Sequence, residues 1–520
     1  MIQDLQLALL PADAADDASI RRFIALELDL APDRISGFHI NKRSIDARSR
    51  QAKFILQVTV FIDEPVQPLI PFDPQLQNVS NKPSVLIAGA GPAGLFAALR
   101  LISLGLKPVI IERGKDVRSR RRDLAAMNKE GVVNPESNYC FGEGGAGTYS
   151  DGKLYTRATK RGDVKRILQL FVHFGADPRI LYEAHPHIGT NKLPHIITAM
   201  RQQIVECGGE VHFDTKLTGI VLEGDRFSGI VVNDNTTIRA KSLILATGHS
   251  ARDIFKLLQE KGIAIESKPF ALGVRIEHPQ HLIDQAQYRC EVRDPFLPPA
   301  SYSLVSQQGG KGVFSFCMCP GGIIAPAATA PGEIVVNGWS PSKRNNPFAN
   351  SGTVVTVDQN DFSDFGFEGP LAGLQFQQMV EQKAYEAGGG KLVAPAQRLV
   401  DFVDGKRSST LPECSYLPGI RSVQLREVLP LIVWQPLQHA IRDFGKKMRG
   451  YFTNEAVLVA TESRTSSPVR IPRDKTSFQH PQIKGLFPCA EGAGYAGGIV
   501  SAAIDGENSA QAAATLYGGE

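Results

Sequence analysis

The sequence lacks the features that mark membrane, secreted and nucleic-acid-binding proteins. No apolar stretch reaches the roughly 20 residues needed to cross a bilayer. The N-terminus has no basic start before its short apolar run, so it does not look like a signal peptide. A net charge of +4 is small for 520 residues and does not favour nucleic acid as a partner.

Paired cysteines are also missing. The seven cysteines have neither zinc-site nor disulfide-framework spacing, and an odd, scattered set is typical of reduced thiols. His185, His187 and His195 lie close together, but their spacing is not that of a helical metal pair. We therefore expect a cytoplasmic protein with no metal site and no membrane span.

What the sequence does contain is the composition of a globular protein with two or three domains, 42% apolar and 21% charged. Residues 1–64 predict a small ferredoxin-like α+β domain from their β-α-β-β pattern. The expected elements are strands at Leu5–Leu10, Ile35–Ile40 and Lys53–Ile62 and a helix at Ser19–Leu28 capped by Ser19. A polar basic turn is expected at residues 41–50. The proline-rich residues 65–83 predict a linker.

Residues 84–114 form a strand, a glycine turn, an apolar helix and a strand, which is a βαβ unit. Gly89, Gly91 and Gly94 have the G-x-G-x-x-G spacing. Gly89 allows the tight turn, Gly91 lets the backbone approach a pyrophosphate, and Gly94 lets the helix pack against the strand. The helix N-terminus would offer free N–H groups and partial positive charge to the phosphates.

Three further segments indicate which dinucleotide the site binds. Glu112 follows the second strand, where a carboxylate accepts hydrogen bonds from ribose hydroxyls and repels a 2′-phosphate, which favours FAD or NAD over NADP. The small-residue turn Ala246-Thr247-Gly248 would let the chain cross near the adenosine phosphates. Glu491 would bind the ribityl hydroxyls, ahead of a second glycine turn that opens a helix aimed at the flavin. The expected contacts of that turn are Gly492, Gly497, Gly498 and Ile499.

These motifs predict an α/β fold with a Rossmann-type FAD-binding domain in two parts, residues 84–269 and 455–520. Between them, residues 270–454 alternate strands, prolines and glycines, with one helical segment at Leu371–Ala387. This texture predicts an inserted, mixed β-rich substrate domain. The run Arg118–Arg122 favours a solvated helix face, with a phosphate contact as the alternative.

Several motifs together carry a family resemblance. They are KRSIDAR (42–48), GAGPAGLFAA (89–98), FGEGGAGTYSDGKL (141–154), PHIGTNKL (186–193), ATGHSARD (246–253), FCMCPGG (316–322), ESRTSSPVRIPRD (462–474) and AEGAGYAGGIVSAAIDG (490–506). Through them the chain resembles the uncharacterised FAD-dependent dehydrogenases related to glutathione-reductase-type flavoproteins. The resemblance implies the same three domains, noncovalent FAD and an oxidoreductase role, but no particular substrate.

The resemblance also implies a backbone cradle for the cofactor. Its members are Glu143, Gly144, Gly145, Gly147 and Thr148. Ala90, Pro92, Ala93 and Arg113 complete the expected FAD contacts. Position 490 holds Ala where a Gly is expected.

Four side chains are candidates for the chemistry. Cys317 and Cys319 alternate on a strand and would share one face, as redox groups or as small packing residues. His249 would act as an acid or base, or bond a backbone carbonyl. Arg464, with Arg470 and Arg473 nearby, would hold an anionic substrate or pair with interface carboxylates.

The sequence has no second dinucleotide fingerprint for NAD(P)H and no C-x-x-x-x-C redox pair. The electron donor would be the organic substrate itself, transiently bound NAD(P)H or an electron-transfer protein. We expect hydride transfer between FAD and an unidentified small organic substrate. An FAD-dependent RNA-modifying enzyme is one alternative, and a non-catalytic redox-sensing flavoprotein is another. A cavity beside the flavin would favour the enzyme, and a sealed apolar face would favour the sensor.

Overall fold

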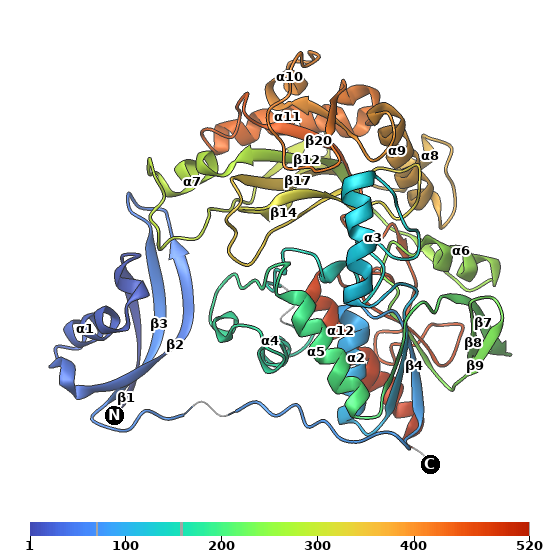
Figure 1. Cartoon of the computed structure of the whole chain (residues 1–520), viewed down its shortest axis with the longest axis horizontal. Helices are drawn as coiled ribbons and strands as arrows, with labels where there is room; N and C mark the ends of the chain where they lie inside the picture. Colours follow the sequence, from blue (N-terminus) through green and yellow to red (C-terminus); the bar gives the residue numbers. More distant parts are fainter. Residues whose placement is uncertain (69–70, 157–159, 519–520) are drawn as a thin grey trace.

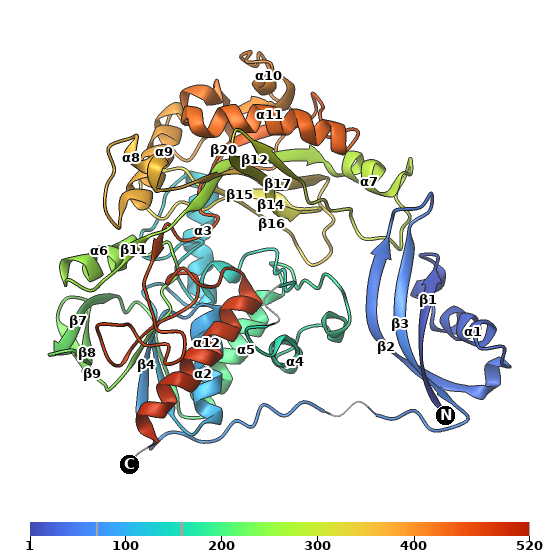
Figure 2. The same ribbon diagram turned by 180° about the vertical axis from the view of Figure 1, so that it is seen from behind.

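The computed structural model describes residues 1–68, 71–156 and 160–518 (Figure 1). A small N-terminal unit stands to one side, and an extended segment leads from it to a domain built on a parallel sheet. A larger sheet domain covers the top of that domain, as the reverse view in Figure 2 also shows. Residues 69–70 of the expected linker and 519–520 at the chain end lie outside the described residues. None of the described helices combines the length and apolarity required to cross a membrane.

The N-terminal unit is a three-stranded antiparallel sheet with one helix packed on it. The sheet order is β1-β3-β2. The elements are β1 (Ile2–Leu9), α1 (Asp17–Glu27), β2 (Ile35–Asp46) and β3 (Lys53–Ile62). Alternate residues Leu56, Val58 and Val60 of β3 are buried in one cluster with Ile20 and Ile24 of α1. A second helix and a fourth strand are not among the described residues of this unit, so the ferredoxin-like assignment stays a prediction.

Two local expectations for this unit are wrong. Asp16, not Ser19, caps α1, because its carboxylate accepts the backbone N–H of Ser19 at 2.8 Å. Strand β2 runs to Asp46, so most of the segment expected as a basic turn pairs with β3 instead. Two of its arginines form ion pairs: Arg43 lies 2.6 Å from Glu183, and Arg48 lies 2.7 Å from Asp46.

The parallel sheet confirms the expected α/β architecture. Its order β22-β10-β4-β5-β6 places the first strand in the middle and the crossovers on both sides, which is the doubly wound arrangement. The strands are β4 (Ser84–Ala88), β5 (Lys107–Ile111), β6 (Glu210–His212), β10 (Leu243–Leu245) and β22 (Leu486–Pro488). All pair in parallel, so their carboxyl ends meet along one edge, where the glycine turns lie.

Each face of this sheet is covered. Helices α2 and α12 lie side by side on one face, and α5 packs beside α2 (Figure 1). A three-stranded sheet and α6 cover the other face. The helices are α2 (Pro92–Ser103), α3 (Val117–Glu130), α4 (Val164–His173), α5 (Leu193–Glu206), α6 (Arg252–Glu260) and α12 (Ile499–Ala514). The covering strands are β7 (Leu217–Glu223), β8 (Arg226–Val232) and β9 (Thr236–Arg239).

The insertion is built on a seven-stranded sheet in the order β13-β14-β17-β12-β20-β18-β19. Its strands are β12 (Phe270–Pro279), β13 (Val305–Gln308), β14 (Lys311–Cys319), β17 (Phe348–Val357), β18 (Ala394–Arg398), β19 (Ile420–Ser422) and β20 (Val457–Glu462). Two small ribbons flank it, β15 (Ile323–Pro326) with β16 (Val336–Trp339) and β11 (Glu266–Ser267) with β21 (Val469–Arg470). The helices are α7 (Gln280–Tyr288), α8 (Gln359–Ser363), α9 (Ala372–Gly388), α10 (Leu399–Val403) and α11 (Leu431–Lys447).

The end of the insertion and one of its helices differ from expectation. Strand β20 pairs with β12, so the insertion's sheet continues beyond the expected end at residue 454. Helix α11 lies over the outer face of the sheet, where a single helix near residues 371–387 had been expected (Figure 2). The sequence did not predict α11 because it contains Pro436, which normally ends a helix, although Val433, Leu437 and Phe444 form a buried helical stripe.

Candidate functional site

One elongated cavity runs from the parallel sheet to the underside of the insertion. Its lower walls are the turn after β4, the end of β5, the turn after β10 and the start of α12. Its upper walls come from β14, β15 and β16, and residues 145–153 form one side. The cavity therefore joins the carboxyl edge of the sheet, where dinucleotides bind in such folds, to the domain expected to hold substrate.

The first glycine turn and the start of α2 border this cavity. Gly89, Gly91, Pro92 and Ala93 line it, so the N-terminus of α2 faces the space. Gly94 does not line the cavity. A Cβ at Gly94 would come within 1.9 Å of the carbonyl oxygen of Gly89, so the turn and the helix could not pack as they do.

Glu112 is buried at the end of β5 and lines the cavity. Its carboxylate accepts the backbone N–H groups of Ala90, Gly114 and Gly142 at 2.9–3.0 Å. Ala90 thus contacts Glu112 and is not among the lining residues. Arg113 does line the cavity, and its guanidinium pairs with Asp253 at 2.7 Å.

The expected cradle of residues 143–148 contributes in two ways. Gly145 and Gly147 line the cavity, whereas Glu143, Gly144 and Thr148 do not line it. Glu143 instead accepts the N–H of Val117 at the start of α3 and lies 2.7 Å from Arg201. Thr148 donates to the carbonyl of Glu143 at 2.7 Å. Glu143 and Thr148 therefore support the loop through these hydrogen bonds, and the expected cofactor contacts of Glu143, Gly144 and Thr148 stay predictions.

Arg120 supports the same loop. It is fully buried and donates to the carbonyl oxygens of Asn138, Glu143 and Gly145 at 2.7–2.9 Å. The expectation of a solvated helix face holds for Arg118, Arg121 and Arg122, which are exposed, and is wrong for Arg120. A lone arginine in a basic run carries no sequence signal that distinguishes it from its neighbours.

The turn after β10 and the start of α12 meet at the same edge. Ala246, Thr247, Gly248, Glu491, Gly498 and Ile499 line the cavity. Gly492 and Gly497 are not among the lining residues; a Cβ at Gly492 would meet the backbone of Gly248 at 2.8 Å, and one at Gly497 would lie 3.1 Å from Glu491. Ala490 has φ +57°, the left-handed region, which explains why a glycine is expected there.

His249 also lines the cavity, beside Glu491. Its Nδ1 lies 3.3 Å from Oε1 of Glu491. The imidazole is therefore next to the expected ribityl-binding carboxylate, and its role as an acid or base stays a prediction.

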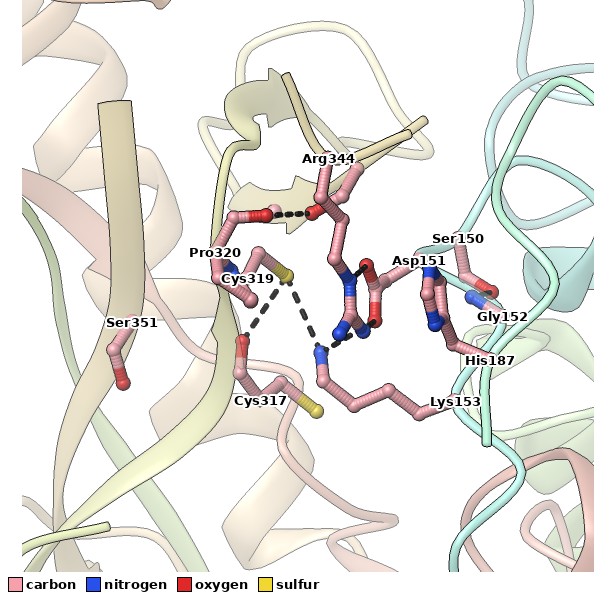
Figure 3. A network of polar contacts seen from close by, with 12 residues as sticks. Ser150, Asp151, Gly152, Lys153, His187, Cys317, Cys319, Pro320, Arg344 and Ser351 are labelled. Carbon is pink, nitrogen blue, oxygen red and sulfur yellow. Dashed lines mark hydrogen bonds and ion pairs between the residues drawn. The ribbon is translucent and has the colours of Figure 1, made fainter. Parts of the chain in front are cut away.

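The sulfur atoms of Cys317 and Cys319 both point toward Lys153, although the strand between them is irregular (Figure 3). The pairing of β14 with β17 shifts between Phe316 and Cys319, and Cys317 has φ +44°, so the alternation of the strand is broken. Cys317 faces the cavity, while Cys319 is 1% exposed beneath it. Burial by the surrounding protein raises the pKa of the Cys317 thiol to about 11.

Arg464 is occupied by protein groups. Its N–H groups donate to Glu381, Glu333, Ser250 and Thr329 at 2.7–3.4 Å, which uses all five donors. Of the two interpretations from sequence, the pairing with interface carboxylates is therefore favoured over a clamp for an anionic substrate.

The sequence alone did not single out Lys153, Asp151 and Asn337, all of which line the upper end of the cavity. Lys153 and Asp151 belong to the quoted FGEGGAGTYSDGKL motif, so their presence was visible but their meeting with the FCMCPGG strand was not. Figure 3 shows the ammonium group of Lys153 between the Cys319 sulfur and the Asp151 carboxylate.

The arrangement fits a flavin dinucleotide. Two helix N-termini, of α2 and α12, face one cavity, and each is preceded by a glycine turn without a Cβ toward the space. Glu112 and Glu491 supply carboxylates at separate places along it. Within the described residues, no group of three or more His, Cys, Asp or Glu side chains is placed to hold a metal ion.

Comparisons with known proteins agree with this fit. Residues 269–465 match a family described as "FAD-dependent protein, C-terminal domain-like", and residues 82–254 match "FAD binding domain". Residues 1–61 match a domain of unknown function. These matches confirm FAD as the cofactor.

Individual relatives add to the family matches. An "uncharacterized protein" of Clostridium beijerinckii is 40% identical over 511 residues, which cover 94% of this chain and 95% of the relative. A thiamine thiazole synthase of Aeropyrum pernix is 28% identical over 199 residues, which cover 35% of this chain and 61% of the relative. A glycine oxidase structure from Bacillus cereus covers 84% of this chain and 96% of its own, with 12% identity and a TM-score of 0.31, too low to inform function.

Proposed function

This chain belongs to the same family of FAD-dependent proteins as its Clostridium beijerinckii relative, and we propose that it is an oxidoreductase. It transfers a hydride between noncovalent FAD and an organic substrate that binds beneath the insertion. The flavin supplies the redox chemistry, and the protein supplies binding, orientation and electrostatics.

The residues that would hold FAD follow the cavity. Glu112 would bind the ribose hydroxyls and Glu491 the ribityl hydroxyls, while the turns at Gly89–Gly91 and Gly145–Gly147 would pass close to the pyrophosphate. The N-terminus of α12 at Gly498 would favour negative charge on a reduced flavin. Each of these roles belongs to the proposal.

The observation that carries the proposal is the upper end of the cavity. It extends past the glycine turns to walls made by the insertion, with the polar side chains of Lys153, Cys317 and Asn337 beside Phe316 and Trp339. An open space with polar groups in an apolar surround is typical of a substrate site. A redox sensor would be expected to seal the flavin with apolar side chains.

The hydride donor is proposed to enter the same cavity. The domain beside the parallel sheet is built on a mostly antiparallel sheet, and its described strands provide one parallel pair, β18 with β19. Such a sheet does not offer a second dinucleotide edge of the usual kind. The organic substrate itself, or nicotinamide bound for a short time, would therefore reduce the flavin.

Anaerobic reduction tests this proposal. The holoprotein would be mixed with NADH, NADPH and a panel of organic acids, alcohols and amines while the flavin absorbance is followed. We expect bleaching by one organic class and slow or weak bleaching by the nicotinamides. Failure of every donor to bleach the flavin, when dithionite bleaches it fully, would count against an enzyme and favour the redox sensor.

A further inference from the structure

A fixed cation lies at the upper end of the cavity. Lys153 lines the space, and 36% of its side chain is exposed. Its ammonium group lies 3.1 Å from the Asp151 carboxylate and donates to the Cys319 sulfur at 3.5 Å (Figure 3). A lysine carries three N–H donors, so at least one donor is left for a group inside the cavity.

Asp151 holds this cation in place. The carboxylate is 4% exposed and also accepts the guanidinium of Arg344 at 2.7 Å. Burial alone would raise the pKa of Asp151, but Lys153 and Arg344 outweigh burial and hold that pKa well below its usual range. Asp151 is therefore an anion in the folded protein, and its charge holds the Lys153 ammonium group at 3.1 Å.

The charges around Lys153 do not cancel. Lys153 and Arg344 carry two positive charges against the single negative charge of Asp151. Behind them, Arg275 is neutralised by Glu462 at 2.6 Å. Burial and the nearby Arg344 lower the pKa of His187 to about 4, so that imidazole is neutral at neutral pH. One positive charge is left in excess at the cavity wall.

Two sulfur atoms lie near the ammonium group. Cys319 Sγ accepts from Lys153 at 3.5 Å and lies 3.2 Å from the carbonyl oxygen of Cys317. Loss of hydration raises the pKa of the Cys317 thiol to about 11, so this thiol is uncharged at neutral pH.

A second donor, the amide group of Asn337, lines the same cavity. The amide oxygen of Asn337 accepts the N–H of Gly338 at 2.7 Å and a guanidinium N–H of Arg275 at 3.3 Å. The amide group of Asn337 is thereby oriented, and its NH₂ is left for the cavity that the side chain lines. The nearby walls are apolar and come from Phe316, Ala325 and Trp339.

We propose that this end of the cavity binds the carboxylate of an organic acid with an apolar body, with Lys153 as the charged donor and Asn337 as the neutral one. The proposal rests on the proposed function and names its substrate class. A charge-assisted hydrogen bond in a partly desolvated site discriminates strongly between a carboxylate and an uncharged isostere.

Binding of matched probes to the FAD-loaded full chain tests this assignment. Benzoate and hexanoate would be compared with benzamide and hexanamide by flavin difference absorbance and by titration calorimetry. We expect each acid to bind about tenfold or more tightly than its amide. Lys153→Met should weaken acid binding about tenfold to hundredfold and leave amide binding unchanged.

Two control variants accompany this test. Lys153→Arg keeps the charge and should retain most of the acid binding. Lys165→Met removes an exposed lysine on α4 and should change nothing. Equal binding of acids and amides would overturn the proposal. So would a Lys153→Met protein that binds acids normally but has an altered flavin spectrum without ligand, because Lys153 would then contact the cofactor.

The binding test is separate from the test of the function. Acid binding is measured on oxidised protein without turnover, and calorimetry does not depend on the flavin. If acids bind as expected but no donor bleaches the flavin, the enzyme proposal fails and the carboxylate site stands. If a donor bleaches the flavin but acids bind no better than amides, the enzyme proposal stands and the carboxylate site fails.

Discussion

The two ends of the cavity are built in different ways. At the sheet end the walls are largely backbone, from glycine turns and helix N-termini whose positions follow from local sequence. At the insertion end the walls include side chains such as Lys153 and Asn337, which are held by hydrogen bonds to Cys319 and Arg275, residues far away in the chain. A backbone-built surface can be recognised from a motif, whereas a surface made by side chains depends on how distant segments meet.

The two ends also differ in how they can be followed. Both tryptophans of the chain, Trp339 and Trp434, belong to the insertion, while the FAD motifs belong to the parallel-sheet domain. Tryptophan fluorescence therefore reports unfolding of one region, and flavin absorbance reports the other. The following variants use these two signals to separate the regions.

The largest effect is expected for Arg275→Met. It leaves the buried carboxylate of Glu462 without its 2.6 Å partner, and breaking such a pair costs about 3–5 kcal/mol. The urea midpoint by tryptophan fluorescence should fall steeply. FAD affinity of the folded protein should change little, because Arg275 does not line the cavity. Arg426→Met, at an exposed position of the insertion, is the control; an equal loss in both variants would contradict the comparison.

Gly94→Ala tests the backbone-built end. The added Cβ would come within 1.9 Å of the Gly89 carbonyl oxygen, and overpacking of this kind costs about 1–3 kcal/mol. The displaced turn should weaken FAD binding about tenfold or more, measured by flavin release. Gly518→Ala, where nothing lies within 4 Å of the added Cβ and φ is −84°, should keep FAD. Normal FAD affinity in Gly94→Ala would remove the glycine turn from the site.

Glu277 on β12 contributes to the pH dependence of the insertion. Burial raises its pKa to about 7 from a usual value near 4.5, so the folded form holds a proton that the unfolded form releases. Its own contribution to stability should therefore fall by about 1–3 kcal/mol as the pH rises from about 4.5 to about 7, whereas the buried His278, with its pKa lowered to about 4, contributes in the opposite direction. The contribution of Glu277 is the difference in slope between the unmodified chain and its Glu277→Gln variant. Tryptophan-detected unfolding across this range checks the slope. Glu277→Gln should flatten it, and Glu455→Gln, at an exposed position, should not.

The smallest effect is expected for Ala490→Gly. Ala490 has φ +57°, a conformation that costs a residue with a Cβ about 1–2 kcal/mol. Glycine avoids this strain, but its larger loss of backbone entropy on folding offsets part of the gain. The variant should gain about 0.5–1 kcal/mol, seen as a higher melting temperature by flavin absorbance. Ala493→Gly, buried nearby without positive φ, should lose stability. A loss in both variants would mean that no strain is relieved at position 490.

The same contrast explains what the sequence could predict. The strand–turn–helix at residues 84–103 has apolar periodicity and glycines at fixed spacing, so its structure follows from local rules. Helix α11 was hidden because Pro436 normally ends a helix, and tertiary packing of Val433 and Leu437 overrides that preference. The irregularity of the strand between Phe316 and Cys319 was hidden for a similar reason, since it is set by pairing with β17.

The sequence alone could not predict which side chains far apart in the chain contact each other. Arg120 and Arg464 look like other arginines in their segments, and only their partners show that one supports the loop at Gly145 and the other pairs with Glu381. No spacing rule links residues that are more than 20 positions apart without a shared element. The roles of Lys153 and Asn337 were missed for the same reason.

The contacts of Arg464 restrict how the two domains can move relative to each other. Arg464 and Arg252 of α6 share Glu381 of α9 and Glu333, so four charges tie the parallel-sheet domain to the insertion at one corner. Separating the two domains at that corner would leave buried charges without partners, which is energetically costly. We therefore expect small molecules to enter the cavity through movements of loops and side chains away from this corner.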